Sequence, residues 1–219
     1  MIKKFTLAGM TDFHKIQYNI TPKTTISSYS QVKVYDGDKE LTILSVSSMG
    51  KEATSGIIEV DEELDLSKTY MVEIENYGKK PVVPTSIFDS AYFIENYTYD
   101  GNDLGAIIDG NQTTFKVWAP TASKVVLNLF ETGHTGTAYK SVDMVKGERG
   151  VWSYTEACGH GTYYTYTVTT SVGTQEAVDP YAKAAGLNGN RGMVVDLSKT
   201  NPEKWTDDFS SGLKSYADA

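Results

Sequence analysis

Hydrophobic and polar residues alternate along short segments in the first part of the chain. Ile16, Tyr18 and Ile20 stand at every second position. Four further segments follow the same period: QVKVY (31–35), LTILSV (41–46), GIIEV (56–60) and TYMVEI (69–74). A period of two is typical of strands with one buried face, and no long stretch has the period of a helix. The pattern therefore predicts an antiparallel β-sandwich.

The pattern changes after residue 74. The stretch ENYGKKPVVP (75–84) holds two prolines, and SIFDSAYFIENY (86–97) is rich in aromatic residues. Asp89 is a suitable N-cap for a short helix in this stretch, because its side chain can accept a hydrogen bond from the first helical turn. We therefore predict a domain boundary here, at about residue 95.

A second series of strand-like segments follows the boundary: TTFKVWAP (113–120), KVVLNLF (124–130), VWSYTE (151–156), GTYYTYTV (161–168) and MVVDL (193–197). Glycine-containing turns separate these segments. The sequence thus predicts an all-β protein with two sandwiches in tandem. Residues 1–95 form the first, residues 96–200 form the second, and residues 201–219 form a linker.

Alternation within the second series predicts which side chains face outward. The predicted core face holds Phe115, Val117, Tyr164 and Tyr166. Lys116, Trp118 and Tyr163 lie on the opposite face, and the sequence leaves the face of Trp152 open. An outward aromatic ring can stack on the apolar face of a sugar while polar neighbours bind its hydroxyls. These four residues are candidate carbohydrate-binding residues, with packing as the alternative role for the three aromatic ones.

Composition and charge narrow the possible ligands. A chain of 219 residues with 15 tyrosines and 19 glycines favours β-structure. Its net charge of −8 argues against nucleic acid as a partner, so an uncharged ligand fits better. The single Cys158 cannot form an internal disulfide, and neither a signal peptide nor a membrane-spanning stretch is visible. We therefore expect a cytoplasmic protein that does not contact a membrane.

The segment YDGNDLGA (99–106) is the strongest candidate for a metal or catalytic loop. An EF-hand that starts at Asp100 would place Leu104 where an oxygen ligand is needed, so the calcium interpretation fails. The three histidines are too dispersed for a zinc site, and no pair of carboxylates stands out for catalysis. We predict no metal site and no catalytic residue. The segment is better interpreted as a hinge-like turn between the sandwiches, with Tyr99 and Leu104 as apolar anchors.

Four motifs in order resemble the region ahead of the catalytic barrel in type I pullulanases. They are YDGNDLGA, FKVWAPTASKVVLNLF, GTYYTYTV and DPYAKAAGLNGNRGMVVDL, which together cover about residues 97–200. The resemblance implies that this part is an immunoglobulin-like carbohydrate-binding module of family 48. Residues 1–80 resemble the preceding pullulanase domain more faintly, which implies a second immunoglobulin-like sandwich that could also bind carbohydrate.

In that family a barrel of glycoside hydrolase family 13 follows the module and carries the catalytic acids. A barrel of this kind needs ~250 residues. The resemblance therefore implies a non-catalytic region of an enzyme that cleaves α-1,6 bonds in pullulan, glycogen or starch, without a cofactor. It also implies a seam with the missing barrel at Asp179, Pro180, Tyr181, Asn188 and Arg191, where Arg191 could pair with a carboxylate.

The sequence departs from the strongest glucan binders of family 48, such as the β-subunit of AMP-activated protein kinase. Those modules carry two tryptophans and a lysine, whereas Phe130 follows Asn128-Leu129 here, Thr165 stands at the lysine position and the turn 171–176 has no Trp. Independent binding of glucan by this module is therefore open. The alternative function is a structural or protein-binding pair of immunoglobulin-like domains.

Overall fold

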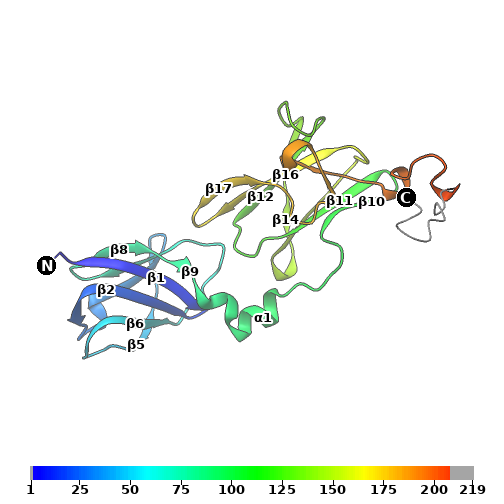
Figure 1. Ribbon diagram of the computed structural model, residues 1–219. Helices are drawn as coiled ribbons and strands as arrows, with labels where there is room; N and C mark the ends of the chain where they lie inside the picture. The colour runs from blue at the N-terminus through cyan, green and yellow to red at the C-terminus, as the bar shows by residue number, and fades with distance from the viewer. Residues whose placement is uncertain (1, 208–219) are drawn as a thin grey trace, which may run out of the picture.

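The computed structural model describes residues 2–207, so residues 208–219 of the predicted linker lie outside it. The described chain forms two β-sandwiches, with a short helix at their junction (Figure 1). The predicted all-β fold with two tandem sandwiches is confirmed. None of the helices between residues 2 and 207 has the length and apolar character needed to cross a membrane.

Two antiparallel sheets and one short parallel pairing build the first sandwich. One sheet has the strand order β5 (Ile43–Val46), β6 (Glu52–Val60), β2 (Lys15–Thr25), β1 (Lys4–Asp12) and β9 (Val83–Pro84). The other has the order β4 (Lys39–Glu40), β3 (Val32–Asp36), β7 (Tyr70–Ile74) and β8 (Gly78–Pro81). The short strand β9 pairs with β1 in parallel. The strand β1 was not predicted, because its apolar residues do not alternate cleanly.

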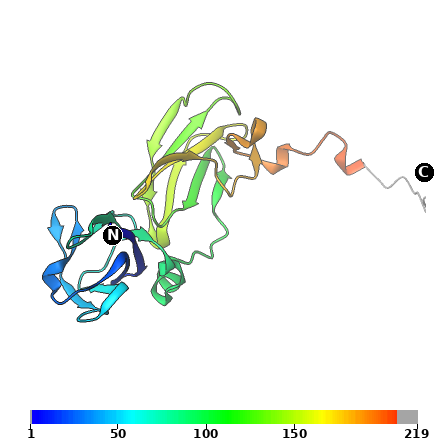
Figure 2. The same cartoon turned by 60° about the vertical axis from the view of Figure 1, so that its left-hand side comes forward.

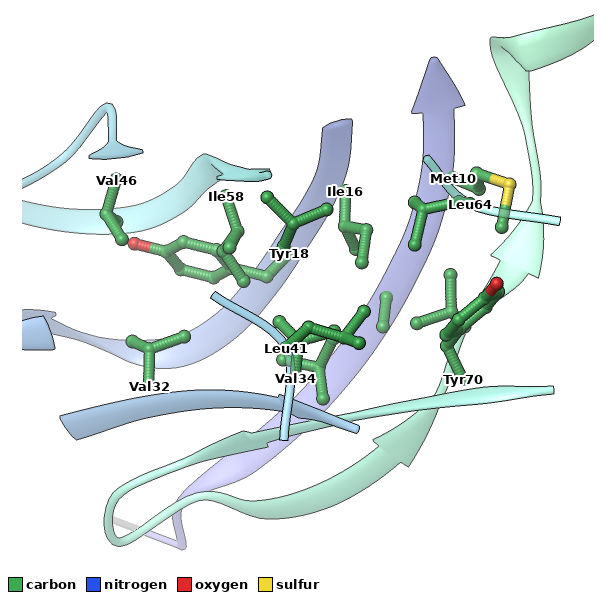
Figure 3. Close-up of a cluster of buried hydrophobic side chains, with 14 of the residues drawn as sticks. Met10, Ile16, Tyr18, Val32, Val34, Leu41, Val46, Ile58, Leu64 and Tyr70 are labelled. Atoms are coloured by element: carbon green, nitrogen blue, oxygen red, sulfur yellow. The ribbon is translucent and has the colours of Figure 1, made fainter. Parts of the chain in front are cut away.

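The core of the first sandwich follows from the alternation in its strands. Ile16 and Tyr18 point inward from β2, and Val32 and Val34 point toward them from β3 (Figure 3). Ile20, also on β2, is buried in the same core. Complete burial of side chains of this size stabilises the fold by about 1.5–3 kcal/mol each. The hydroxyl of Tyr18 is paired with Ser48, so the ring brings no unsatisfied polar atom into the core.

Two further sheets build the second sandwich. One has the order β10 (Gly105–Asp109), β11 (Gln112–Trp118), β15 (Val151–Glu156) and β14 (Val145–Lys146). The other has the order β13 (Lys140–Asp143), β12 (Lys124–Phe130), β16 (Tyr163–Thr170), β19 (Gly192–Met193) and β18 (Ala184–Ala185), and β17 (Gly173–Ala177) also pairs with β16. The core of the second sandwich contains Phe115 and Val117 from the first of these sheets and Tyr164 and Tyr166 from the other, as predicted.

The helix α1 (Ala91–Tyr97) lies between the two sandwiches in both views (Figures 1 and 2). Its N-cap is Ser90, whose Oγ accepts a hydrogen bond from the Phe93 amide at 3.2 Å. The predicted N-cap, Asp89, instead ends the preceding 3₁₀ turn at Ser86–Asp89. Phe93 is buried in the first core and stacks on Tyr97 at 5.1 Å between ring centroids, so the first sandwich holds one face of the helix.

Two segments of the second sandwich differ from the prediction. The turn at 99–106 ends early, because Gly105 already begins β10. The predicted strand at 193–197 continues only to Met193. The carboxylate of Asp196 accepts hydrogen bonds from the amide and hydroxyl of Ser198, which turns the chain into a 3₁₀ turn at Leu197–Lys199.

Candidate functional site

The acidic segment at 99–106 is held by a charged contact with strand β11. Asp103 accepts hydrogen bonds from Lys116 and from the hydroxyl of Tyr99. Lys116, with help from Tyr99, keeps the pKa of the Asp103 carboxyl below its usual range, and Asp103 raises the pKa of Lys116. The predicted hinge-like turn is therefore anchored at its centre, and the candidate sugar-binding Lys116 is engaged with a carboxylate.

Trp118 lies where the second sandwich meets helix α1. Its indole N–H donates to the backbone oxygens of Tyr97, at 2.9 Å, and Arg149, at 3.0 Å. The ring contacts the edge of Phe93 at 6.3 Å between centroids and packs against the first core. The polar atom of Trp118 is thus used within the protein, and only the surface of its ring is left for a ligand.

Arg149 reaches from the second sandwich to the end of helix α1. Its Nη1 donates to the backbone oxygens of Glu95, at 2.8 Å, and Thr98, at 3.0 Å. The last carbonyls of a helix lack partners within the helix, and a cation is favourable there. Arg149 has a φ of +56°, which is uncommon for a residue with a side chain. A non-glycine residue keeps such a backbone only where its surroundings hold it.

A groove lies between the two sandwiches beside these contacts. Its volume is about 330 Å³, and we call it the inter-sandwich groove. It is lined by Phe88, Phe93, Ile94, Thr98, Tyr99, Leu104, Trp118 and Tyr181. Five of these side chains are aromatic and none is charged. Of the four residues predicted to bind carbohydrate, only Trp118 lines this groove.

The expectation that Trp152 could face a ligand is wrong. Trp152 is 6% exposed and belongs to the second core, and its indole N–H donates to the Ala119 oxygen at 3.1 Å. The strand register explains this placement, because Trp152 pairs with the inward residue Val117. Tyr163 lies on β16, away from the groove, and its half-buried ring abuts Gly133.

Asp179 was expected at a surface seam, and this prediction is also wrong. The residue is 3% exposed. Its carboxylate accepts hydrogen bonds from the hydroxyls of Tyr164, at 2.8 Å, and Tyr166, at 3.4 Å, and from the Tyr181 amide at 2.8 Å. Burial raises the pKa of the Asp179 carboxyl, and these donors partly oppose that rise. Asp179 therefore joins the core to the segment that carries Tyr181.

The other predicted seam residues have separate positions. Within residues 2–207, Arg191 pairs with no carboxylate: its guanidinium donates to the backbone oxygens of Thr132, Thr135 and Gly136 and stacks on Phe130 at 3.5 Å. Pro180 and Asn188 are exposed, and Tyr181 is 44% exposed at the inter-sandwich groove. Their contact with a barrel stays a prediction.

The side chains of Thr165 and Asn128, two positions that were compared with strong glucan binders, are engaged in hydrogen bonds within the sandwich. Thr165 is 2% exposed, and its hydroxyl donates to Glu176 at 2.5 Å. Asn128 donates to the Thr167 hydroxyl at 2.8 Å and accepts from Ser141 at 2.8 Å. Among residues 2–207, no group of three His, Cys, Asp or Glu side chains could hold a metal ion.

Sequence reasoning missed Arg149 and the groove residues of the first sandwich. Arg149 stands in the turn at 147–150, between Glu148 and Gly150, and no pattern in the sequence marks it as a contact residue. Ile94 belonged to the predicted short helix and Phe88 preceded its predicted N-cap, but the sequence could not tell which side of this aromatic stretch the second sandwich would cover. The contacts depend on how two separate domains pack.

Residues 103–182 match the family model described as carbohydrate-binding module 48 (isoamylase N-terminal domain). The matched residues lie in the second sandwich, which is therefore similar to modules of family 48. A pullulanase of Bacillus subtilis (strain 168) is 30% identical over 147 residues, which are 67% of this chain and 20% of that protein. The predicted resemblance to pullulanases is thereby confirmed.

Solved pullulanases have the same arrangement of strands over most of the chain. The pullulanase of Anoxybacillus sp. LM18-11, solved with maltotetraose, is 33% identical with a TM-score of 0.66 and covers 90% of this chain. The pullulanase from Bacillus acidopullulyticus has a TM-score of 0.82 over 94% of this chain at 20% identity, which is a likeness of fold. The chain spans 27% of the Anoxybacillus protein and 38% of the Bacillus acidopullulyticus protein.

Proposed function

We propose that this chain is a non-catalytic part of a pullulanase, which binds α-glucan and supports the catalytic barrel. The observation that carries the proposal is the match of residues 103–182 to a family of carbohydrate-binding modules. Leu104, Trp118 and Tyr181, which form one wall of the inter-sandwich groove, all fall within the matched residues. The part of the chain that resembles a sugar-binding module thus contributes aromatic surface to a groove.

The nature of the groove supports an uncharged ligand. A glucan has no charged groups, and its pyranose rings offer apolar faces that stack on aromatic side chains. The groove has aromatic walls and no charged lining residue, and the chain has a net charge of −8 that would disfavour polyanions. The Anoxybacillus pullulanase was solved with maltotetraose, which makes short α-linked glucose oligomers the first ligands to test.

Binding is tested by electrophoresis of the native chain in gels that contain pullulan, glycogen or amylopectin. We expect each polysaccharide to slow the chain relative to a gel without polysaccharide, because a bound polymer hardly migrates. A protein without affinity for glucan, run in the neighbouring lane, corrects for the viscosity of the gel. Equal relative mobility in all gels would contradict glucan binding and favour a structural or protein-binding pair of domains.

The non-catalytic part of the proposal has its own test. Hydrolysis of a glycosidic bond normally needs two carboxyl groups about 5–5.5 Å or 6.5–9.5 Å apart across the substrate. The inter-sandwich groove is lined by no carboxylate, and the nearby Asp103 is engaged with Lys116. We expect the purified chain to release no reducing sugar from pullulan, with a commercial pullulanase as the positive control. If the release of reducing sugar co-purifies with the chain through two purification steps, the non-catalytic role is contradicted, whereas glucan binding is not.

A further inference from the structure

The inter-sandwich groove offers ring surfaces at positions that solvent can reach. Tyr181 is 44% exposed and Phe88 is 41% exposed, and they come from different sandwiches. Trp118 lies with them, and its N–H is already bonded to two backbone oxygens. A side chain whose polar atom is satisfied can receive an apolar ligand face without losing a hydrogen bond. The three rings therefore suit stacking against pyranose rings.

Two polar side chains line the groove, and one of them, Tyr99, connects it to a charged pair outside the lining. Thr98 and Tyr99 line the groove, and Tyr99 is bonded to Asp103, which also holds Lys116. The side chains of Lys116 and Asp103 are 29% and 36% exposed. A carboxylate accepts and an ammonium donates, so the pair can serve both roles of a hydroxyl group. Ligand sites commonly combine mostly apolar walls with a few fixed polar groups of this kind.

The two walls of the groove are held in place before a ligand arrives. Arg149 and Trp118 tie the second sandwich to the end of helix α1 through three hydrogen bonds, to the backbone oxygens of Glu95, Tyr97 and Thr98. Gly105 has a φ of +95°, and a Cβ there would lie 2.8 Å from the Tyr181 backbone oxygen, so the chain passes closely behind Tyr181. A site whose walls are already ordered loses less entropy when it binds.

We propose that the inter-sandwich groove binds a short stretch of α-glucan, with Trp118 and Tyr181 from the second sandwich and Phe88 from the first stacking on its glucose rings. The inference rests on the proposed function and names its site. Binding then needs both sandwiches, and it takes place away from the polar face around Thr165. The volume of about 330 Å³ is at the lower end of ligand pockets, so the groove holds a small part of a polymer.

The test compares two tyrosines with similar exposure. Tyr181→Ala removes a ring from the groove, and Tyr139→Ala removes a ring that is 50% exposed and does not line it. Titration calorimetry of the whole chain with maltotetraose measures the affinity. We expect Tyr181→Ala to weaken binding about tenfold or more, the effect of losing about 1.4 kcal/mol. Tyr139→Ala should bind as the unchanged chain does, and Tyr181→Phe, which keeps the ring, should restore most of the affinity.

Phe88→Ala tests whether the first sandwich takes part, and circular dichroism shows that each variant is folded. We expect Phe88→Ala to weaken maltotetraose binding several-fold. If Tyr181→Ala and Phe88→Ala both bind maltotetraose with the affinity of the unchanged chain, the groove is not the binding site, and the proposed function stands. If only Phe88→Ala keeps full affinity, the shared site is overturned. If the unchanged chain binds neither maltotetraose nor the polysaccharides, both proposals fail, and a protein segment becomes the better occupant.

Discussion

Asp179→Ala is expected to lower the free energy of unfolding of the second sandwich by about 3 kcal/mol. The substitution leaves the buried hydroxyls of Tyr164 and Tyr166 without their acceptor and releases the Tyr181 amide. A buried donor that loses its partner costs about 1–3 kcal/mol. Urea denaturation followed by tryptophan fluorescence measures the effect, because all three tryptophans lie at residue 118 or beyond.

The control is Asp143→Ala, which removes an exposed carboxylate paired with Lys124. Exposed ion pairs contribute little to stability, so this variant should unfold at nearly the same urea concentration as the unchanged chain. Equal losses in the two variants would contradict the role assigned to the buried carboxylate. Because Asp179 also positions Tyr181, Asp179→Ala should weaken maltotetraose binding if the inter-sandwich groove is the site.

The protonation of Asp179 gives this prediction a pH dependence. Burial raises the pKa of the carboxyl in the folded chain, so the folded state holds its proton more tightly than the unfolded state does. From about pH 3.9, the ordinary pKa of aspartate, up to the folded pKa, the contribution of Asp179 to stability therefore falls as pH rises. Above that window it is constant. The difference in unfolding free energy between the unchanged chain and Asp179→Asn should follow this course, and a difference that rises with pH would contradict it.

The alternation of side chains predicted most strands because each sandwich buries one face of each sheet. Phe115 and Val117 on β11, and Tyr164 and Tyr166 on β16, are inward because the period of two holds through both strands. The same rule could not orient Trp152, since VWSYTE has hydrophobic residues on both faces. The pairing of Trp152 with Val117 decides its side, and strand register is a long-range property that a single segment does not contain.

The candidate site was harder to predict than the strands. Trp118 was predicted to be an outward aromatic residue. In the structure its indole N–H donates to the Tyr97 oxygen at the end of helix α1, a contact that no sequence pattern indicates. Asp179 was expected at a seam with the barrel, and its place before Pro180 is typical of a turn. Its amide partner Tyr181 fits that interpretation, whereas the two tyrosines that bury it come from β16. Local chemistry was predictable in both cases, and the three-dimensional partners were not.

Arg149→Ala is expected to loosen the two sandwiches relative to each other. The substitution removes both hydrogen bonds from the guanidinium to the Glu95 and Thr98 oxygens and leaves the end of α1 without its cation. The loss should be about 1–2 kcal/mol, because the contacts are charged but exposed. Spin labels at positions 38 and 174, in a Cys158→Ser background, measure the distance between sandwiches by double electron–electron resonance. We expect a broader distribution of distances.

Two further variants separate the bridge from other effects of Arg149. Arg149→Gly removes the guanidinium while relieving the positive φ, so it should broaden the distances as Arg149→Ala does. Arg191→Ala breaks a similar set of hydrogen bonds to backbone oxygens, but all of them lie within the second sandwich, so it should leave the distances unchanged.

A narrow, unshifted distribution in both Arg149 variants would show that Trp118 and the packing of α1 hold the sandwiches together without the hydrogen bonds of Arg149. The inter-sandwich groove would then keep its shape, and its affinity for maltotetraose should be unchanged as well. If the bridge does hold the groove open, affinity should fall as the distribution broadens, which links the backbone strain at Arg149 to ligand binding at Tyr181.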